Sequence, residues 1–185
     1  MRCPFHKTIQ FLLLLGVFSC ANPPAWSQTR QFQFEQFPVK VYKGPIKIPA
    51  GLHKDEEDDW RDKDDLLVVP PGLEVNFAGE YCLYEISCGT SCSVYQLANL
   101  RTSIKIPAIS MFSGGEEPAK TKDGHPYVTA LYYKPDSRLL IAEYHLDFEV
   151  PDKTETCRQR YFVLENSKIR PISKTFMFCT EERKQ

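Results

Sequence analysis

The stretch 76–95 constrains the fold more than any other part of this 185-residue chain. Residues 80–86 are mostly aromatic, aliphatic or cysteine, which is typical of a β-strand that is at least half buried. Gly89 then supplies the backbone freedom that a sharp reversal needs. Cys88 and Cys92 flank this reversal, and a second strand follows them. The stretch therefore predicts a hairpin whose turn is clamped by two cysteines.

Residues 1–27 have the pattern of a secretory signal peptide. Arg2 and Lys7 form a basic start, and residues 11–18 form an apolar segment that is too short to span a bilayer. Small residues permit cleavage after position 19, 21 or 27. The sequence thus predicts an exported protein, periplasmic or secreted.

Cys20 offers an alternative to simple cleavage. It ends the run Val-Phe-Ser-Cys, which loosely resembles a bacterial lipobox and would make Cys20 the lipid-bearing first residue of an anchored protein. The simpler interpretation is a soluble protein from which Cys20 has been removed. No later segment is apolar for long enough to be a membrane helix.

The remaining chain, residues 28–185, has the length of a single domain that buries a core. Without Arg2 and Lys7 it carries 21 basic and 24 acidic residues, a net charge of about −3 with histidine neutral. A nucleic-acid-binding protein would show a basic excess, so nucleic acid is not an expected partner.

Five cysteines follow the leader, and in an exported chain they are candidates for disulfides first and for metal ligands second. We expect Cys88 to pair with Cys92 and Cys157 to pair with Cys179. Cys82 is then left as a buried free thiol that behaves as a small hydrophobic residue. The Cys88–Cys92 spacing is one residue longer than that of a thioredoxin-like motif, which favours a structural disulfide.

Alternation of apolar and polar residues predicts further strands, and no stretch has convincing helical periodicity. Residues 32–42 resemble a strand that Pro38 interrupts. Residues 46–50 recur letter for letter at 104–108, and a similar strand–turn–strand pattern spans 162–172. We therefore expect an all-β domain of antiparallel hairpins, arranged as a sandwich, a barrel or partial propeller-like sheets.

Two segments are interpreted as surface loops. Residues 54–65 contain eight acidic residues but lack the ordered spacing and the central glycine of an EF-hand, which favours a solvated loop over a calcium site. Residues 110–126 are rich in glycine, proline and charge, and they predict a long flexible loop. Long loops in compact domains are often functional.

A hairpin is expected from strands at 127–133 and 139–150. In the second strand, Glu143, His145 and Asp147 fall on the face opposite to the core. Three such side chains on one face offer metal ligands, but the same pattern describes the wet side of an antiparallel sheet. We expect no metal or cofactor, and a metal-dependent hydrolase that uses these three residues is the alternative.

The run Asn-Phe-Ala-Gly-Glu-Tyr at 76–81, followed by Cys-Gly-Thr-Ser-Cys at 88–92, resembles a family of uncharacterised exported bacterial proteins. Asp-Ser-Arg-Leu-Leu at 136–140 and an aromatic strand at 161–166 extend the resemblance. Members often have glycine where this chain has Ser87. The resemblance implies export and β structure, and it supplies no catalytic residues to transfer.

The chain contains no nucleophile elbow, zinc-protease helix or phosphate-binding glycine loop. We therefore expect a non-enzymatic, exported, disulfide-stapled domain that binds a protein or an envelope component through loops 110–126 and 54–65. A structural envelope lipoprotein anchored at Cys20 is a further alternative.

Overall fold

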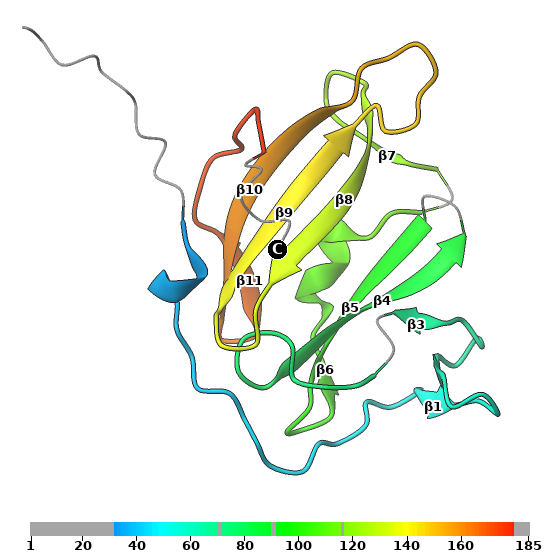
Figure 1. Cartoon of the computed structure of the whole chain (residues 1–185), viewed down its shortest axis with the longest axis vertical. Coiled ribbons are helices and arrows are strands. Elements are labelled where there is room, and N and C mark those ends of the chain that lie inside the picture. Colours follow the sequence, from blue (N-terminus) through cyan, green and yellow to red (C-terminus); the bar gives the residue numbers. More distant parts are fainter. Residues whose placement is uncertain (1–31, 70–71, 90–91, 116, 180–185) are drawn as a thin grey trace, which may run out of the picture. The chain divides into compact units, whose positions relative to one another are not determined.

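Two antiparallel sheets form the framework of the computed structural model (Figure 1). The chain divides after Gln31 into two units, and every residue described below belongs to the second, Phe32–Gln185. The structure describes residues 32–69, 72–89, 92–115 and 117–179, without the side chains of residues 69, 87–89 and 92. The prediction of an all-β domain is confirmed, because the helical segments of this part are two short 3-10 helices.

The larger sheet is curled and has the strand order β11-β10-β9-β8-β7, and the smaller sheet has the order β3-β4-β5-β6. A separate two-stranded ribbon pairs β1 with β2. The elements, in chain order, are η1 (Phe34–Gln36), β1 (His53–Lys54), β2 (Trp60–Arg61), β3 (Val68–Val69), β4 (Tyr81–Gly89), β5 (Cys92–Asn99), β6 (Ile104–Lys105), η2 (Pro107–Phe112), β7 (Ala119–Lys120), β8 (Pro126–Tyr133), β9 (Leu139–Leu146), β10 (Thr156–Glu165) and β11 (Lys168–Pro171).

Short reversals set the order of the strands. Asn166 and Ser167 join β10 to β11, and both have positive φ, 50° and 57°. Such a two-residue turn matches the twist of the strands that it connects. The predicted hairpins at 76–95, at β8–β9 and at β10–β11 are all present.

The main core lies between the two sheets. Leu83 and Leu97 of the smaller sheet and Leu140 of the larger sheet belong to one buried cluster. Helix η2 adds Phe112, whose ring meets that of Phe162 edge-on at 5.0 Å between centroids. Aromatic pairs in this geometry stabilise a core by about 0.5–1.5 kcal/mol beyond the area that they bury.

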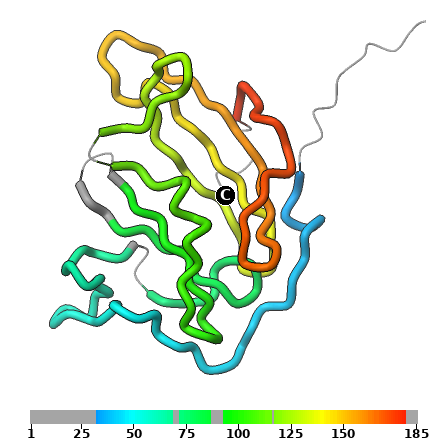
Figure 2. Tube along the Cα trace, turned by 180° about the vertical axis from the view of Figure 1, so that it is seen from behind, coloured from blue at the N-terminus to red at the C-terminus, as the bar shows by residue number. Residues whose placement is uncertain are grey.

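Irregular segments cover the outer faces of both sheets. The segment before β4 packs onto Tyr84 and Cys82 on the outer face of the smaller sheet. On the larger sheet, Phe37 near the start of the described chain and Phe176 near its end pack against Tyr161, and Figure 2 shows both segments along this sheet. The face of β9 that alternation assigned to solvent is therefore partly covered.

The strands predicted in residues 32–48 are wrong. Phe34–Gln36 forms η1, closed by a hydrogen bond in which the Gln33 amide donates to Gln36 Oε1 at 3.1 Å. The alternating phenylalanines pack their rings onto the larger sheet instead of alternating across a strand. Residues 39–48 are irregular, and Pro45 within them and Pro38 and Pro49 at their two ends lack the amide donors that a ladder needs. Residues 46–50 and 104–108 therefore do not form a structural repeat.

The motif at 76–81 connects three parts of the fold. The Asn76 side chain accepts from the Leu83 amide at 2.7 Å and donates to its carbonyl at 2.8 Å, as a neighbouring strand would. The Gly79 amide donates to Pro135 O at 2.7 Å in the β8–β9 turn. Gly79 has φ +82°, and a Cβ there would lie 2.7 Å from Lys40 O, so glycine is required.

Two further predicted boundaries are wrong. Strand β9 ends at Leu146, because Asp147 and Glu149 adopt positive φ and turn the chain away from the ladder. Phe148, which strand alternation through 139–150 would place on the core face opposite Asp147, is exposed. Part of the segment 110–126 is regular structure, with η2 at its start and β7 within it. Within the described residues, no helix is long and apolar enough to cross a bilayer.

Candidate functional site

A groove of about 550 Å³ opens between the two sheets. This volume is within the range of roughly 300–1,000 Å³ that is usual for ligand sites. Its walls come from β4, β5, η2, the segment after η2, β8 and the turn after β9. The lining includes Leu83, Glu85, Ser93, Tyr95, Met111, Phe112, Ser113, Pro118, Val128, Thr129, Leu131, Tyr133, Phe148 and Glu149.

One wall of the groove is a strand edge that has no neighbouring strand in the described part of the chain. β7 pairs with β8 only at Pro126 and Tyr127, so positions 128–131 extend beyond it. Pro126 O accepts from the Asp147 amide, which places even-numbered backbone groups toward β9. Because backbone groups alternate along a strand, those of Thr129 and Leu131 face the groove. Thr129 O indeed accepts from the Tyr95 hydroxyl at 2.8 Å across the groove.

Acidic side chains give the groove its charge. Glu85 is half-buried in the wall and accepts a hydrogen bond from Ser93 Oγ, and Glu149 lines the groove as well. Among the described residues, no lysine, arginine or histidine lines it. Burial raises the pKa of Tyr133 to about 12, and the charge of Glu85 adds to this shift. The Tyr133 hydroxyl is therefore neutral, and the acidic side chains supply the charge of the described lining.

Large apolar side chains lie at this groove with much of their surface in water. Met111 is 59% exposed and Phe148 is 39% exposed. Met111 belongs to the segment 110–126, whose functional role was predicted from its length, and this segment supplies one side of the groove. Exposed apolar groups beside a concave site are typical of a surface that binds a partner.

The three predicted metal ligands do not lie together. Glu143 and His145 are neighbours on the outer face of β9, where Glu143 Oε2 lies 3.9 Å from His145 Nε2. Asp147 lies in the turn beyond the strand and contacts other side chains. The separation follows from the end of β9 at Leu146, because strand alternation does not continue into the turn.

Cys157 of β10 takes the place that was predicted for Asp147. The register pairs Cys157 with His145, and ligand atoms of Glu143, His145 and Cys157 all lie within 4.8 Å of one another. Cys157 forms the predicted disulfide with Cys179, with 5.5 Å between the Cα atoms. Among the described cysteine side chains, Cys82 is free and fully buried, as predicted.

Other polar side chains orient Glu143 and His145. Gln159 Nε2 donates to Glu143 Oε1 at 2.8 Å, and the Tyr161 hydroxyl donates to Gln159 Oε1 at 2.9 Å. On the opposite side, His145 Nδ1 lies 2.6 Å from Glu155 Oε1. Glu143 is only 6% exposed, so its carboxylate is nearly buried, and it is the last acceptor of the hydrogen-bond chain from Tyr161 through Gln159.

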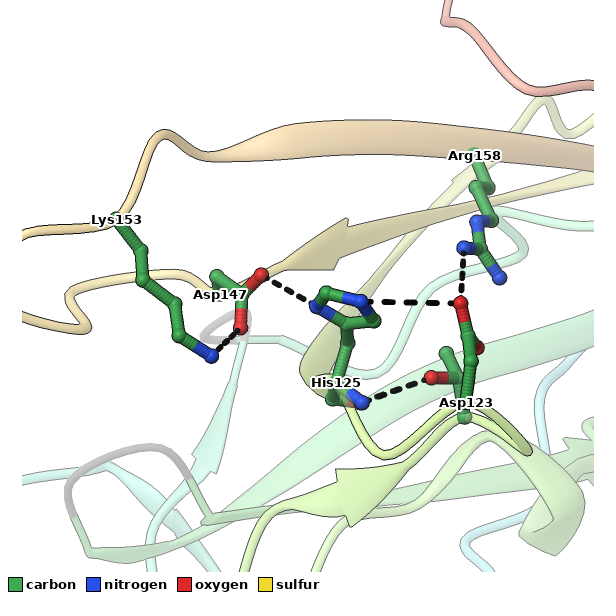
Figure 3. Close-up of polar contacts among 6 residues, drawn as sticks. Asp123, His125, Asp147, Lys153 and Arg158 are labelled. Atoms are coloured by element: carbon green, nitrogen blue, oxygen red, sulfur yellow. Dashed lines mark hydrogen bonds and ion pairs between the residues drawn. The ribbon is translucent and has the colours of Figure 1, made fainter.

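Asp147 forms a second cluster with His125 and Lys153 (Figure 3). His125 Nδ1 lies 2.7 Å from one carboxylate oxygen, and Lys153 Nζ donates to the other at 2.9 Å. The Lys153 hydrogen bond, followed by that of His125, holds the pKa of Asp147 below its usual range. The two ring nitrogens of His125 face the carboxylates of Asp147 and Asp123.

Asp123 joins this cluster to β10. Its carboxylate accepts from Arg158 Nη2 at 3.1 Å and lies 3.7 Å from His125 Nε2, and Figure 3 shows the ring between the two acids. The Thr121 hydroxyl and Arg158 both lower the pKa of Asp123. The cluster therefore ties the loop before β8 to the β9–β10 connection, which is a structural role.

Several carboxylates of the acidic loop 54–65 have partners within the loop itself. Asp55 accepts hydrogen bonds from the amides of Glu57 and Asp59 and from Arg61 Nε at 2.7 Å, and the Arg61 guanidinium holds the pKa of Asp55 below its usual range. Asp62 accepts from two amides in the same way. These carboxylates cap turns, and they do not line the groove.

Several predicted features lie outside the described residues. They are the leader 1–27 with Cys20, and the side chains of Cys88 and Cys92. The backbones of β4 and β5 do pair up to Gly89 and Cys92, as the predicted hairpin requires.

The groove and the residues that orient Glu143 and His145 were not predicted from the sequence. Gln159 and Glu155 belong to no motif. Gln159 lies opposite Glu143 in the β9–β10 register, and Glu155 immediately precedes β10. One signal was available in the sequence: Cys157 and Gln159 are two positions apart, so in a strand they lie on the same face.

No protein-family model, curated protein or solved structure matches this chain.

Proposed function

We propose that this protein is an exported, non-enzymatic binding domain, and that an extended segment of a partner protein docks in the groove as an added strand beside β8. The observation that carries the proposal is the edge formed by Thr129 and Leu131, whose backbone groups face the groove beyond the end of β7. Strand addition supplies affinity through main-chain hydrogen bonds, and adjacent pockets supply specificity.

The lining favours a peptide with apolar side chains and one basic residue. Tyr133, Phe112 and Met111 offer apolar surface, whereas Glu85 and Glu149 are the charged groups among the described residues that line the groove. A lysine or arginine beside half-buried Glu85 would form a charge-assisted hydrogen bond, worth about 1.5–3 kcal/mol. The partner would thus be a protein or envelope component that presents a basic extended segment.

Export is supported by the leader pattern of residues 1–27 and by the Cys157–Cys179 disulfide, since disulfides persist in oxidising compartments. N-terminal mass analysis of the secreted protein distinguishes cleavage after residue 19, 21 or 27 from a lipidated Cys20.

The probe for the groove is a blocked seven-residue peptide of alternating valine and threonine with a central lysine. Fluorescence anisotropy of the labelled peptide measures its affinity for the purified protein. We expect saturable binding that weakens about tenfold in Glu85→Gln, the loss of one charge-assisted hydrogen bond. Glu56→Gln is the matched control, because Glu56 is an exposed acid of the acidic loop and should leave the affinity unchanged.

A second pair of peptides separates strand addition from attraction by charge. Methylation of two alternate peptide amides removes the donors that would reach Thr129 and Leu131, and it leaves the lysine in place. We expect this peptide to lose binding, and methylation of the intervening amides to be tolerated. Equal binding of both methylated peptides, or an equal effect of Glu85→Gln and Glu56→Gln, would contradict the proposal.

A further inference from the structure

We propose that reduction of the Cys157–Cys179 disulfide creates a zinc site formed by Cys157, His145 and Glu143. The inference is independent of the proposed peptide groove, because the three residues lie on the outer face of β9 and β10 and do not line that groove.

The three side chains offer a ligand set that zinc prefers. Thiolate sulfur, imidazole nitrogen and carboxylate oxygen bind zinc at about 2.0–2.3 Å, which places neighbouring ligand atoms of a tetrahedral site roughly 3.3–3.8 Å apart. Here the three ligand atoms lie within 4.8 Å of one another, and the distance from His145 Nε2 to Glu143 Oε2 is 3.9 Å. Side-chain rotations that move the ligand atoms by about 1 Å would therefore let all three coordinate one zinc ion.

The surrounding hydrogen bonds prepare two of the three ligands. A carboxylate only accepts, so Glu155 favours the His145 tautomer that carries its hydrogen on Nδ1 and leaves the Nε2 lone pair free. The Gln159 amide donates a hydrogen bond to Oε1 of Glu143. The other oxygen, Oε2, faces His145 Nε2 and is positioned to coordinate zinc. Histidine and carboxylate ligands of zinc are commonly oriented by such outer contacts.

The disulfide controls the third ligand, because the thiolate binds zinc and a disulfide sulfur does not. A dithiol reductant supplies two electrons and two protons, which break the S–S bond and leave thiols on Cys157 and Cys179. Zinc then displaces the proton of the Cys157 thiol. The Cys179 end of the chain stays near, because Phe176 exchanges two backbone hydrogen bonds with Gln159.

Two single substitutions test the site without any reductant. Cys179→Ser and Cys157→Ser both remove the cross-link, but only Cys179→Ser retains the Cys157 thiol. After incubation with zinc chloride and desalting, we expect Cys179→Ser to retain one zinc per chain, and Cys157→Ser and the oxidised wild-type protein to retain none. Adding His145→Ala or Glu143→Gln to Cys179→Ser should weaken zinc binding at least tenfold.

Cobalt substitution identifies the ligand directly. Cobalt in Cys179→Ser should give the charge-transfer band of a thiolate ligand and the visible bands of a tetrahedral ion, and both should be absent from Cys157→Ser. If Cys179→Ser is poorly folded, the metal content of reduced wild-type protein is compared with that of Cys157→Ser under the same reductant. The reductant is a phosphine, which is converted to the phosphine oxide as it breaks the disulfide. Equal metal content in that pair, or in the two single variants, would overturn the proposal, as would a folded Cys179→Ser that retains no metal.

Discussion

Removing the Cys157–Cys179 disulfide should cost the domain a predictable share of its stability. The two cysteines are 22 positions apart. For a closed loop of that length, chain entropy gives a change of about −11 cal/mol/K in the unfolded state, or about 3.4 kcal/mol at 25 °C. The folded state should change little, because Phe176 keeps its backbone hydrogen bonds to Gln159 when the sulfurs are absent.

The perturbation is the double substitution Cys157→Ala/Cys179→Ala, and the assay is equilibrium urea unfolding followed by fluorescence. With a slope of about 2 kcal/mol/M, a loss of about 3.4 kcal/mol lowers the unfolding midpoint by roughly 1.7 M. The slope itself should rise slightly, because the unfolded chain without a cross-link exposes more surface.

The control repeats both curves in a reducing agent, where the wild-type protein should match the double variant. A midpoint difference below roughly 0.3 M without reductant would contradict this prediction, because it would mean that the disulfide does not restrict the unfolded chain.

Three other perturbations test the fold. Asn76→Ala removes two hydrogen bonds to the Leu83 backbone and should cost about 1–3 kcal/mol in urea unfolding, whereas a loss below 0.5 kcal/mol, roughly the effect of a neutral surface change, would contradict this role. Burial raises the pKa of the Cys82 thiol to about 12, so a thiol reagent should modify Cys82 only as fast as the protein unfolds, and rapid labelling of the native protein would count against that burial. Lys153 lowers the pKa of Asp147, so the stabilisation is present above the ordinary value of about 3.9 and is lost as the pH falls through the lower folded value. Asp147→Asn should therefore lower the thermal midpoint at pH 7 and reduce its further fall between pH 4 and pH 2, and parallel profiles of variant and wild type would contradict the assignment.

The hairpins were predictable because their signals are local. Alternation and turn residues identify β4–β5, β8–β9 and β10–β11. Residues 32–37 show the limit of the same rule. Their phenylalanines alternate with polar residues, but the rings pack onto the outer face of the larger sheet. The backbone forms η1 instead of a strand, because Gln33 and Gln36 cap each other.

The cluster of Glu143, His145 and Cys157 and the open edge of β8 could not be predicted, because each depends on how neighbouring strands pair. Cys157 meets His145 because β10 pairs with β9 in one particular register, and the connection between them adopts positive φ at residues other than glycine. The edge at Thr129 exists because β7 is only two residues long. Neither the register nor the length of a neighbouring strand follows from alternation.

Amide hydrogen exchange along β8 reports whether the strand edge at Thr129 and Leu131 is open and whether it receives the peptide. We expect fast exchange at Thr129 and Leu131 in the free protein, and slow exchange at both when the lysine-containing peptide is bound. Exchange at Ala130 should be slow throughout, since its amide faces β9. Protection of Thr129 and Leu131 in the free protein, or no change in them under saturating peptide, would contradict strand addition at this edge.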